Sequence, residues 1–78
     1  MKEVYVNIDS IEKVNRFVGI LNQHQGNFDI VEGSYIVDAK SLMGIMTMDL
    51  SKPKKLVFNG DETNAIQDLS EFLVERSA

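Results

Sequence analysis

The chain is organised around KSLMGIMTM, residues 40–48, a stretch that places a hydroxyl in front of an apolar run. Ser41 is a natural N-cap, because its side-chain oxygen can accept a hydrogen bond from the free backbone N–H groups of a first helical turn. The residues that follow predict a two-turn helix, residues 41–48, with no polar face. Gly44 lowers the helical propensity of this segment by about 1 kcal/mol relative to alanine. Tertiary contacts or a partner must therefore hold the helix, and its flexible methionines suit a binding surface.

Length and composition limit both the fold and the function. The 78 residues contain no cysteine, and 12 acidic against 8 basic residues give a net charge of −4. They predict one small domain, residues 1–78, without disulfides or thiolate metal sites. The charge argues against nucleic acids and anionic membranes as partners. Because we find neither a signal-peptide pattern nor an apolar run of membrane-spanning length, we expect a cytoplasmic protein.

The first third of the chain predicts a strand followed by a helix. Residues 3–8 alternate between polar and apolar side chains, as in a half-buried strand. Asp9 or Ser10 can cap a helix of about residues 10–25, and Gly26 can end it. The apolar side chains of this helix recur at helical spacing: Ile11, Val14, Phe17, Val18 and Leu21.

Residues 28–39 predict a β-hairpin. Gly33-Ser34 reads as a two-residue turn in which glycine supplies a positive φ. This turn pairs Asp29 with Asp38 and Val31 with Ile36, and it puts all four on the sheet face opposite the core. The core face of the hairpin then holds Phe28, Ile30, Val37 and Ala39.

The last third of the chain predicts a strand and a helix. Pro53 prevents continuation of the preceding helix, and residues 55–59 form the fourth strand, with Leu56 and Phe58 inward. Gly60 turns the chain, Asp61 and Glu62 begin the final helix, and Arg76 lies near its end. The apolar stripe of this helix consists of Ala65, Ile66, Leu69, Phe72 and Leu73. The element order β-α-β-β-α-β-α implies an α+β fold, a four-stranded antiparallel sheet with three helices on one face.

Two of these stretches carry a family resemblance. Residues 40–48 resemble the regulatory-serine segment of HPr, the histidine-containing phosphocarrier of the bacterial sugar phosphotransferase system, which typically reads Lys-Ser-Ile-Met-Gly-Val-Met-Ser-Leu. Residues 60–69, GDETNAIQDL, are similar to the start of the last helix in that family. The resemblance runs from about residue 28 to the end and implies the HPr-like open-faced sandwich. The first helix matches only in its apolar pattern.

The resemblance also shows which chemistry is missing. An HPr phosphocarrier carries its phosphate on a histidine at the start of the first helix, next to an arginine. Alignment of the apolar positions puts Ser10, a degenerate phosphocarrier position, near the histidine and Glu12 near the arginine. A serine ester is too stable for a high-energy carrier. The single histidine, His24, falls at the other end of the helix, where we expect it to be solvated.

The resemblance therefore implies a regulatory or adaptor paralogue that has lost histidine phosphotransfer. Ser41 matches the serine that HPr kinase/phosphorylase modifies, and a phosphate there would lie next to Lys40. The expected partner-binding residues are Lys40, Leu42, Met43 and Met46. The expected partners are HPr kinase/phosphorylase, a transcription regulator or enzymes of the sugar system, with no cofactor and no metal.

Two alternatives stay open at this point. The chain could still be an active sugar-system phosphocarrier, in which case His24 would be labelled. It could instead be a self-associating structural module, a weak homodimer formed through Val31, Ile36, Tyr5 and Val57 on the open sheet face. We do not expect an enzyme, because the sequence has no nucleophile–base pair, metal cluster or glycine-rich phosphate loop.

Overall fold

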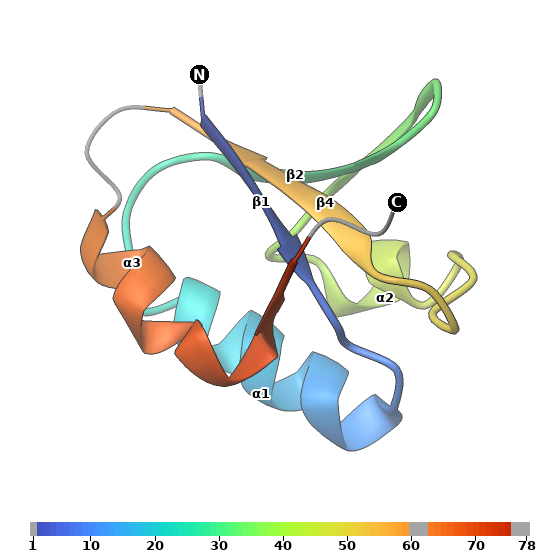
Figure 1. Ribbon diagram of the computed structural model, residues 1–78, viewed down its shortest axis with the longest axis horizontal. Coiled ribbons are helices and arrows are strands. Elements are labelled where there is room, and N and C mark those ends of the chain that lie inside the picture. The colour runs from blue at the N-terminus through green and yellow to red at the C-terminus, as the bar shows by residue number, and fades with distance from the viewer. Residues whose placement is uncertain (1, 60–62, 76–78) are drawn as a thin grey trace.

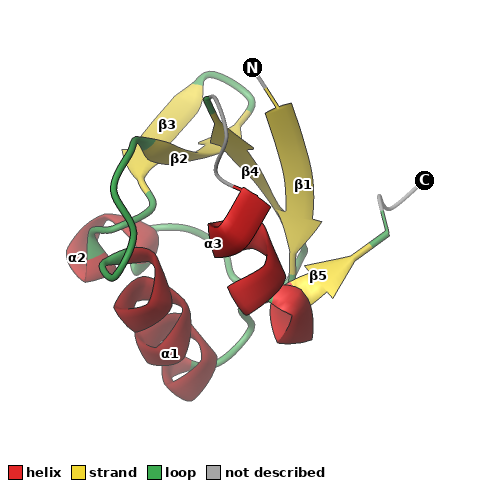
Figure 2. Cartoon of the chain, turned by 90° about the vertical axis from the view of Figure 1, so that its left-hand side faces the viewer, coloured by secondary structure: helices red, strands yellow, loops and turns green. Residues whose placement is uncertain are grey.

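The helices of the structure cover one face of an antiparallel sheet and leave the other face open (Figures 1 and 2). The computed structural model describes residues 2–59 and 63–75, which form five strands and three α-helices. The strands are β1 (Lys2–Val6), β2 (Phe28–Glu32), β3 (Tyr35–Asp38), β4 (Lys54–Phe58) and β5 (Leu73–Val74). Their order in the sheet is β3-β2-β4-β1-β5. The helices are α1 (Ile11–Leu21), α2 (Leu42–Ile45) and α3 (Thr63–Asp68), and a 3₁₀ turn, Ser70–Phe72, follows α3.

Helix α1 is capped by Ser10, whose side-chain oxygen accepts the Lys13 backbone N–H. Its buried residues are those of the predicted stripe, Val14, Phe17 and Leu21, but Ile11 is exposed. The helix ends at Leu21, with Asn22 as its C-cap, so the predicted end near residue 25 is wrong. The chain turns after Asn22 and reaches Gly26, which has a positive φ of 109°.

The hairpin of β2 and β3 has the predicted register. Gly33 has a φ of 61°, no other residue of the turn has a positive φ, and Glu32 pairs with Tyr35. Asp29 lies opposite Asp38, and Val31 lies opposite Ile36. The core and open faces of the hairpin are therefore those that the two-residue turn predicts.

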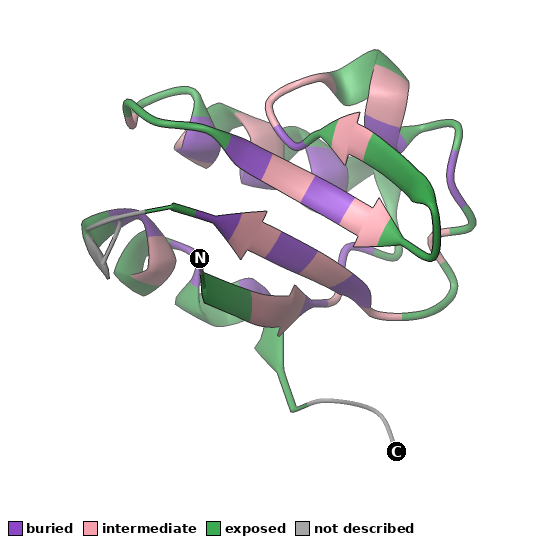
Figure 3. Cartoon of the chain, turned by 90° about the horizontal axis from the view of Figure 1, so that it is seen from above, coloured by how far each residue is buried: buried purple, intermediate pink, exposed green. Residues whose placement is uncertain are grey.

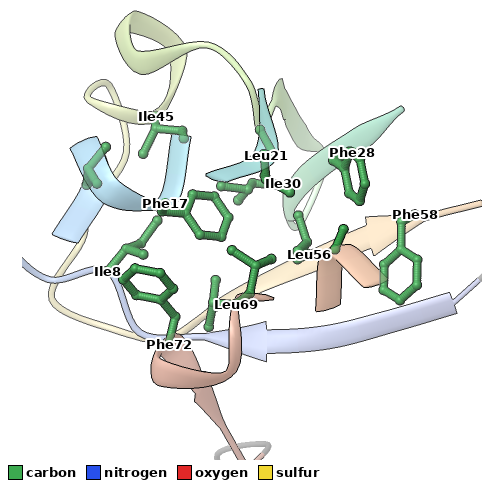
Figure 4. Close-up of a cluster of buried hydrophobic side chains, with 14 of the residues drawn as sticks. Ile8, Phe17, Leu21, Phe28, Ile30, Ile45, Leu56, Phe58, Leu69 and Phe72 are labelled. Carbon is green, nitrogen blue, oxygen red and sulfur yellow. The ribbon is translucent and has the colours of Figure 1, made fainter. Parts of the chain in front are cut away.

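The core fills the space between the sheet and the helices (Figure 4). Two aromatic pairs lie in it: Phe17 meets Phe72 edge-on at 5.7 Å between ring centroids, and Phe28 stacks on Phe58 at 6.3 Å. Leu56 and Phe58 point inward from β4, as predicted. These contacts tie α1 and the C-terminal segment to the centre of the sheet.

The predicted number of strands and the predicted last helix are wrong. The apolar spacing through Leu73 suggested one long helix, but α3 ends at Asp68 and Leu73 is extended, with φ −69° and ψ 134°. The Phe72 carbonyl accepts the Asn7 backbone N–H at 2.8 Å, and β5 then pairs with β1 as a fifth strand. The predictions for Gly60, Asp61, Glu62 and Arg76 lie outside the described residues.

Lys54 is a buried cation that the sequence did not reveal. It begins β4 on the inner face, its side chain is 1% exposed, and its Nζ donates to Glu32 Oε2 at 2.7 Å. Glu32 itself is 46% exposed and keeps contact with water. Among the described residues, the Lys54 ammonium group has Glu32 as its one hydrogen-bond partner, whereas the Glu32 carboxylate is also solvated by water.

This asymmetry gives a stability prediction. Glu32→Gln should lower the free energy of unfolding by about 1–3 kcal/mol, because it leaves a buried charge without its counter-charge. Lys54→Met should change it by less than about 1 kcal/mol, because a hydrophobic side chain can fill the site and Glu32 stays hydrated. Urea unfolding followed by circular dichroism measures both. A greater loss for Lys54→Met than for Glu32→Gln would contradict this account.

Candidate functional site

Ser41 caps α2 as the sequence predicts. Its backbone is extended, with φ −103° and ψ 108°, and its Oγ accepts the Gly44 N–H at 3.1 Å. The α-helical part is shorter than the predicted 41–48, because α2 ends at Ile45 and Met46 is the C-cap. One cap on so short a helix cannot stabilise it alone, so packing must do so.

The apolar run divides between the core and the surface. Ile45 and Met48 are buried, whereas Leu42, Met43 and Met46 are exposed, and Met43 is 79% exposed. We call these three exposed side chains the α2 patch. They are the apolar residues predicted to bind partners, and the structure places them together beside Ser41.

Tyr35 and Thr47 hold the far end of this segment against the sheet. The Thr47 hydroxyl donates to the Gly44 carbonyl at 2.7 Å, so the Tyr35 hydroxyl is the donor of the 2.6 Å bond to Thr47 Oγ1. Neither residue stands out in the sequence as a candidate for this role. The register of the hairpin could have indicated the role of Tyr35, because it puts this side chain on the face of β3 that the helices cover.

Lys40, the charged member of the predicted binding set, is engaged elsewhere. Its Nζ donates to the His24 carbonyl at 2.6 Å and lies 5.5 Å from the centroid of the Phe28 ring. The Asn22 side chain also donates to the Lys40 carbonyl, at 3.3 Å. Lys40 therefore joins α2 to the end of α1, and a phosphate on Ser41 would have to compete for its ammonium group.

The start of α1 carries a serine cap and two ion pairs. Ser10 occupies the cap. The Lys13 ammonium group binds the Asp9 carboxylate at 2.9 Å, and this hydrogen bond lowers the pKa of Asp9 below its ordinary value. Arg16 pairs with Glu71 at 3.2 Å and lies 5.9 Å from the centroid of the Phe72 ring.

His24 is bound rather than solvated, in contrast to the prediction. Its Nε2 lies 2.9 Å from Asp68 Oδ2 at the end of α3, and its side chain is 20% exposed. The histidine lies beyond the C-terminal end of α1, at the opposite end from Ser10, and it joins the ends of two helices. No arginine is bonded to it within residues 2–59 and 63–75.

Residues 2–59 and 63–75 form no pocket and no group of three metal-ligating side chains. None of the helices in these ranges is long and apolar enough to cross a bilayer.

Comparison with known proteins bears on the fold. No protein-family model matches the chain, and neither does any curated protein. Among solved structures, HPr-C-His from Thermoanaerobacter tengcongensis superposes with a TM-score of 0.75 at 29% identity, over 91% of this chain and 89% of that one. The phosphocarrier protein HPr from Bacillus anthracis gives 0.73 at 23% identity, over 94% of each chain. A histidine-containing phosphocarrier protein from Mycoplasma gives 0.70 at 14% identity, over 90% of this chain and 86% of that one.

The chain has an HPr-like fold. The predicted α+β architecture, with three helices against an antiparallel sheet, is thus confirmed at the level of the fold, with five strands in place of four among the described residues. Ser41 begins the second helix of this HPr-like domain, and Ser10 begins the first.

The cap on α2 can be tested directly. Ser41→Ala should lower the free energy of unfolding by about 1 kcal/mol, because the Gly44 N–H loses its acceptor. Ser41→Asp should keep most of that stability, since a carboxylate can accept the same bond. Urea titrations of both variants, with Ser34→Ala in the hairpin turn as the control, measure the effect. Equal stability of Ser41→Ala and the unaltered chain would show that the bond contributes nothing.

Proposed function

We propose that this chain is an HPr-like regulatory adaptor, related to the phosphoenolpyruvate-dependent sugar phosphotransferase system. It binds protein partners through the α2 patch in the cytoplasm, does not carry phosphate on histidine and has no catalytic activity of its own. The observation that carries the proposal is the exposure of Leu42, Met43 and Met46 together beside Ser41. The likeness of the fold to HPr phosphocarriers supports the link to the sugar system.

The chemistry of the α2 patch suits a protein partner. Methionine side chains are flexible and polarisable, so they can adapt to the shape of an apolar partner surface. Met43 makes little contact with its own chain, since 79% of it is exposed. The buried Ile45 and Met48 fix the backbone from which these flexible side chains project. The partner thus meets a fixed helix with adaptable side chains.

The start of α1 supports the absence of a histidine carrier. Ser10 occupies the cap, where the resemblance would require an imidazole. Glu12 lies in the first turn of the helix, and its carboxylate repels an incoming phosphoryl group. His24 is bound to Asp68 at the other end of α1 and so has a structural role.

Ser41 supplies a switch within this proposal. A phosphate would add about −1.5 to −2 charges at the edge of the α2 patch. Partners whose apolar contact surface is lined by acidic residues would then be repelled, and partners with basic residues would be attracted. The Lys40 ammonium group can turn to the phosphate only by leaving the His24 carbonyl, so modification would also loosen the joint between α2 and α1.

The phosphorylation state separates the adaptor from a carrier. With HPr kinase/phosphorylase and ATP, we expect the unaltered chain to gain the mass of one phosphoryl group and Ser41→Ala to gain none. With phosphoenolpyruvate and enzyme I, we expect no label. A functional HPr phosphocarrier serves as the positive control in both reactions. Acid-labile label on His24 would overturn the adaptor proposal, and an unmodified Ser41 would remove the switch alone.

Docking through the α2 patch is tested by charge insertion. Met46→Asp should reduce capture of partner proteins from a lysate of the host cell at least tenfold, because a carboxylate would be desolvated in an apolar contact. Ile36→Asp makes the same change at an exposed side chain on the open face of the sheet and should keep the proteins that bind α2. Captured proteins are identified by mass spectrometry, and circular dichroism checks that both variants fold. Identical capture by all three chains would contradict docking through α2.

A further inference from the structure

We propose that the open face of the sheet binds a polypeptide segment that presents basic and aliphatic side chains together. The site, which we call the outer-face patch, consists of Val31 and Ile36 with the adjacent carboxylates of Asp29 and Asp38. It shares no residue with the α2 patch and lies on the other side of the sheet from the helices (Figure 3). The inference therefore does not rest on the proposed function.

The apolar part of the patch follows from the register. Val31 lies opposite Ile36 on one side and opposite Lys55 on the other, and Lys55 lies opposite Tyr5. These side chains form one row across the open face. Ile36 is 62% exposed, and its neighbour Val31 on the same face is half-buried. A branched aliphatic side chain at this level of exposure is available for contact with a partner.

The acidic part of the patch lies two residues further along the same strands, on the same face. Asp29 lies opposite Asp38. The next pair along the strands is Phe28 with Ala39, and it is hydrogen-bonded, because the Ala39 N–H donates to the Phe28 carbonyl. Asp29 and Asp38 therefore form a non-hydrogen-bonded pair, in which opposite side chains approach most closely. Two carboxylates in this arrangement repel each other.

No cation of the described residues forms an ion pair with either aspartate. Lys55, the lysine of the open face, lies 3.9 Å from Glu3, on the other side of β4 from the aspartates. Lys40 follows β3 closely in sequence, but its ammonium group is held by the His24 carbonyl. Among the described residues, the Asp38 carboxylate accepts the Lys40 backbone N–H, at 2.9 Å, and the Asp38 carbonyl accepts the Ser41 N–H, at 3.0 Å. Within residues 2–59 and 63–75, neither aspartate forms an ion pair.

The charge pattern selects the occupant. A lysine or arginine of a partner can lie between Asp29 and Asp38 while its aliphatic neighbours cover Val31 and Ile36. A second copy of this chain fits poorly, because two open faces in contact would each contribute Glu3, Asp29 and Asp38 against a single Lys55. Nucleic acids and anionic lipids are repelled for the same reason. A basic, aliphatic polypeptide segment satisfies both halves of the patch.

The test uses a defined probe, an acetylated and amidated peptide Lys-Ile-Lys-Val-Lys-Ile, titrated into the isotope-labelled full chain and followed by backbone amide NMR. We expect shifts centred on Asp29, Val31, Ile36 and Asp38. A peptide with serine in place of each aliphatic residue should bind at least fivefold more weakly, because it keeps the charge but loses the apolar contact.

Matched variants locate the charge contact. Asp29→Asn with Asp38→Asn should weaken the probe about tenfold, and the double variant should fold at least as stably as the unaltered chain, because it removes a repulsion. Glu12→Gln removes an exposed carboxylate from α1 and should leave affinity within about twofold. Equal weakening by Glu12→Gln, or shifts spread over the whole surface, would show mere attraction of opposite charges and overturn the proposal. Sedimentation that shows a dimer lost on Ile36→Ser would assign the face to a second copy and overturn it too.

Discussion

The structure depends on the burial of Ile45 and Met48 beneath a helix too short to exist alone. A single α-helical turn gains little from its own hydrogen bonds, because the cost of nucleation outweighs them. The two buried side chains supply the free energy that holds α2 to the sheet, at about 1.5–3 kcal/mol each. Since the run has no polar face, burying these two residues leaves Leu42, Met43 and Met46 exposed. The α2 patch is thus a direct consequence of how this short helix is anchored.

Alternation along the strands sets the second surface. The two-residue turn at Gly33 fixes which side chains of β2 and β3 face the helices, and a change of register by one residue would exchange the two faces. The same alternation that buries Ile30 must turn Asp29 and Val31 outward. A domain with helices on one side of its sheet therefore presents two chemically distinct surfaces without any pocket among its described residues.

The sequence predicted the local features well because short-range chemistry determines them. The caps at Ser10 and Ser41 and the turn at Gly33 each follow from the neighbouring residues, and each is confirmed. The errors concern contacts between distant segments. Leu73 continues the helical spacing of the residues before it, but the bond from the Asn7 N–H to the Phe72 carbonyl favours a strand. His24 was expected to be solvated, but its partner Asp68 lies 44 residues away in the sequence.

The strength of the ion pairs near the start of α1 can be compared with the chemistry of its Ser10 hydroxyl as determinants of phosphotransfer. The pairs of Lys13 with Asp9 and of Arg16 with Glu71 are largely exposed, so water screens both attractions and each contributes little. That is too little to exclude a bound phosphate, whose oxygens could replace either carboxylate. The nucleophile itself makes the difference. An imidazole forms a phosphoramidate that readily passes its phosphoryl group on, whereas the Ser10 hydroxyl would form a stable ester. Free cations beside Ser10 would therefore not give its hydroxyl the chemistry of an imidazole.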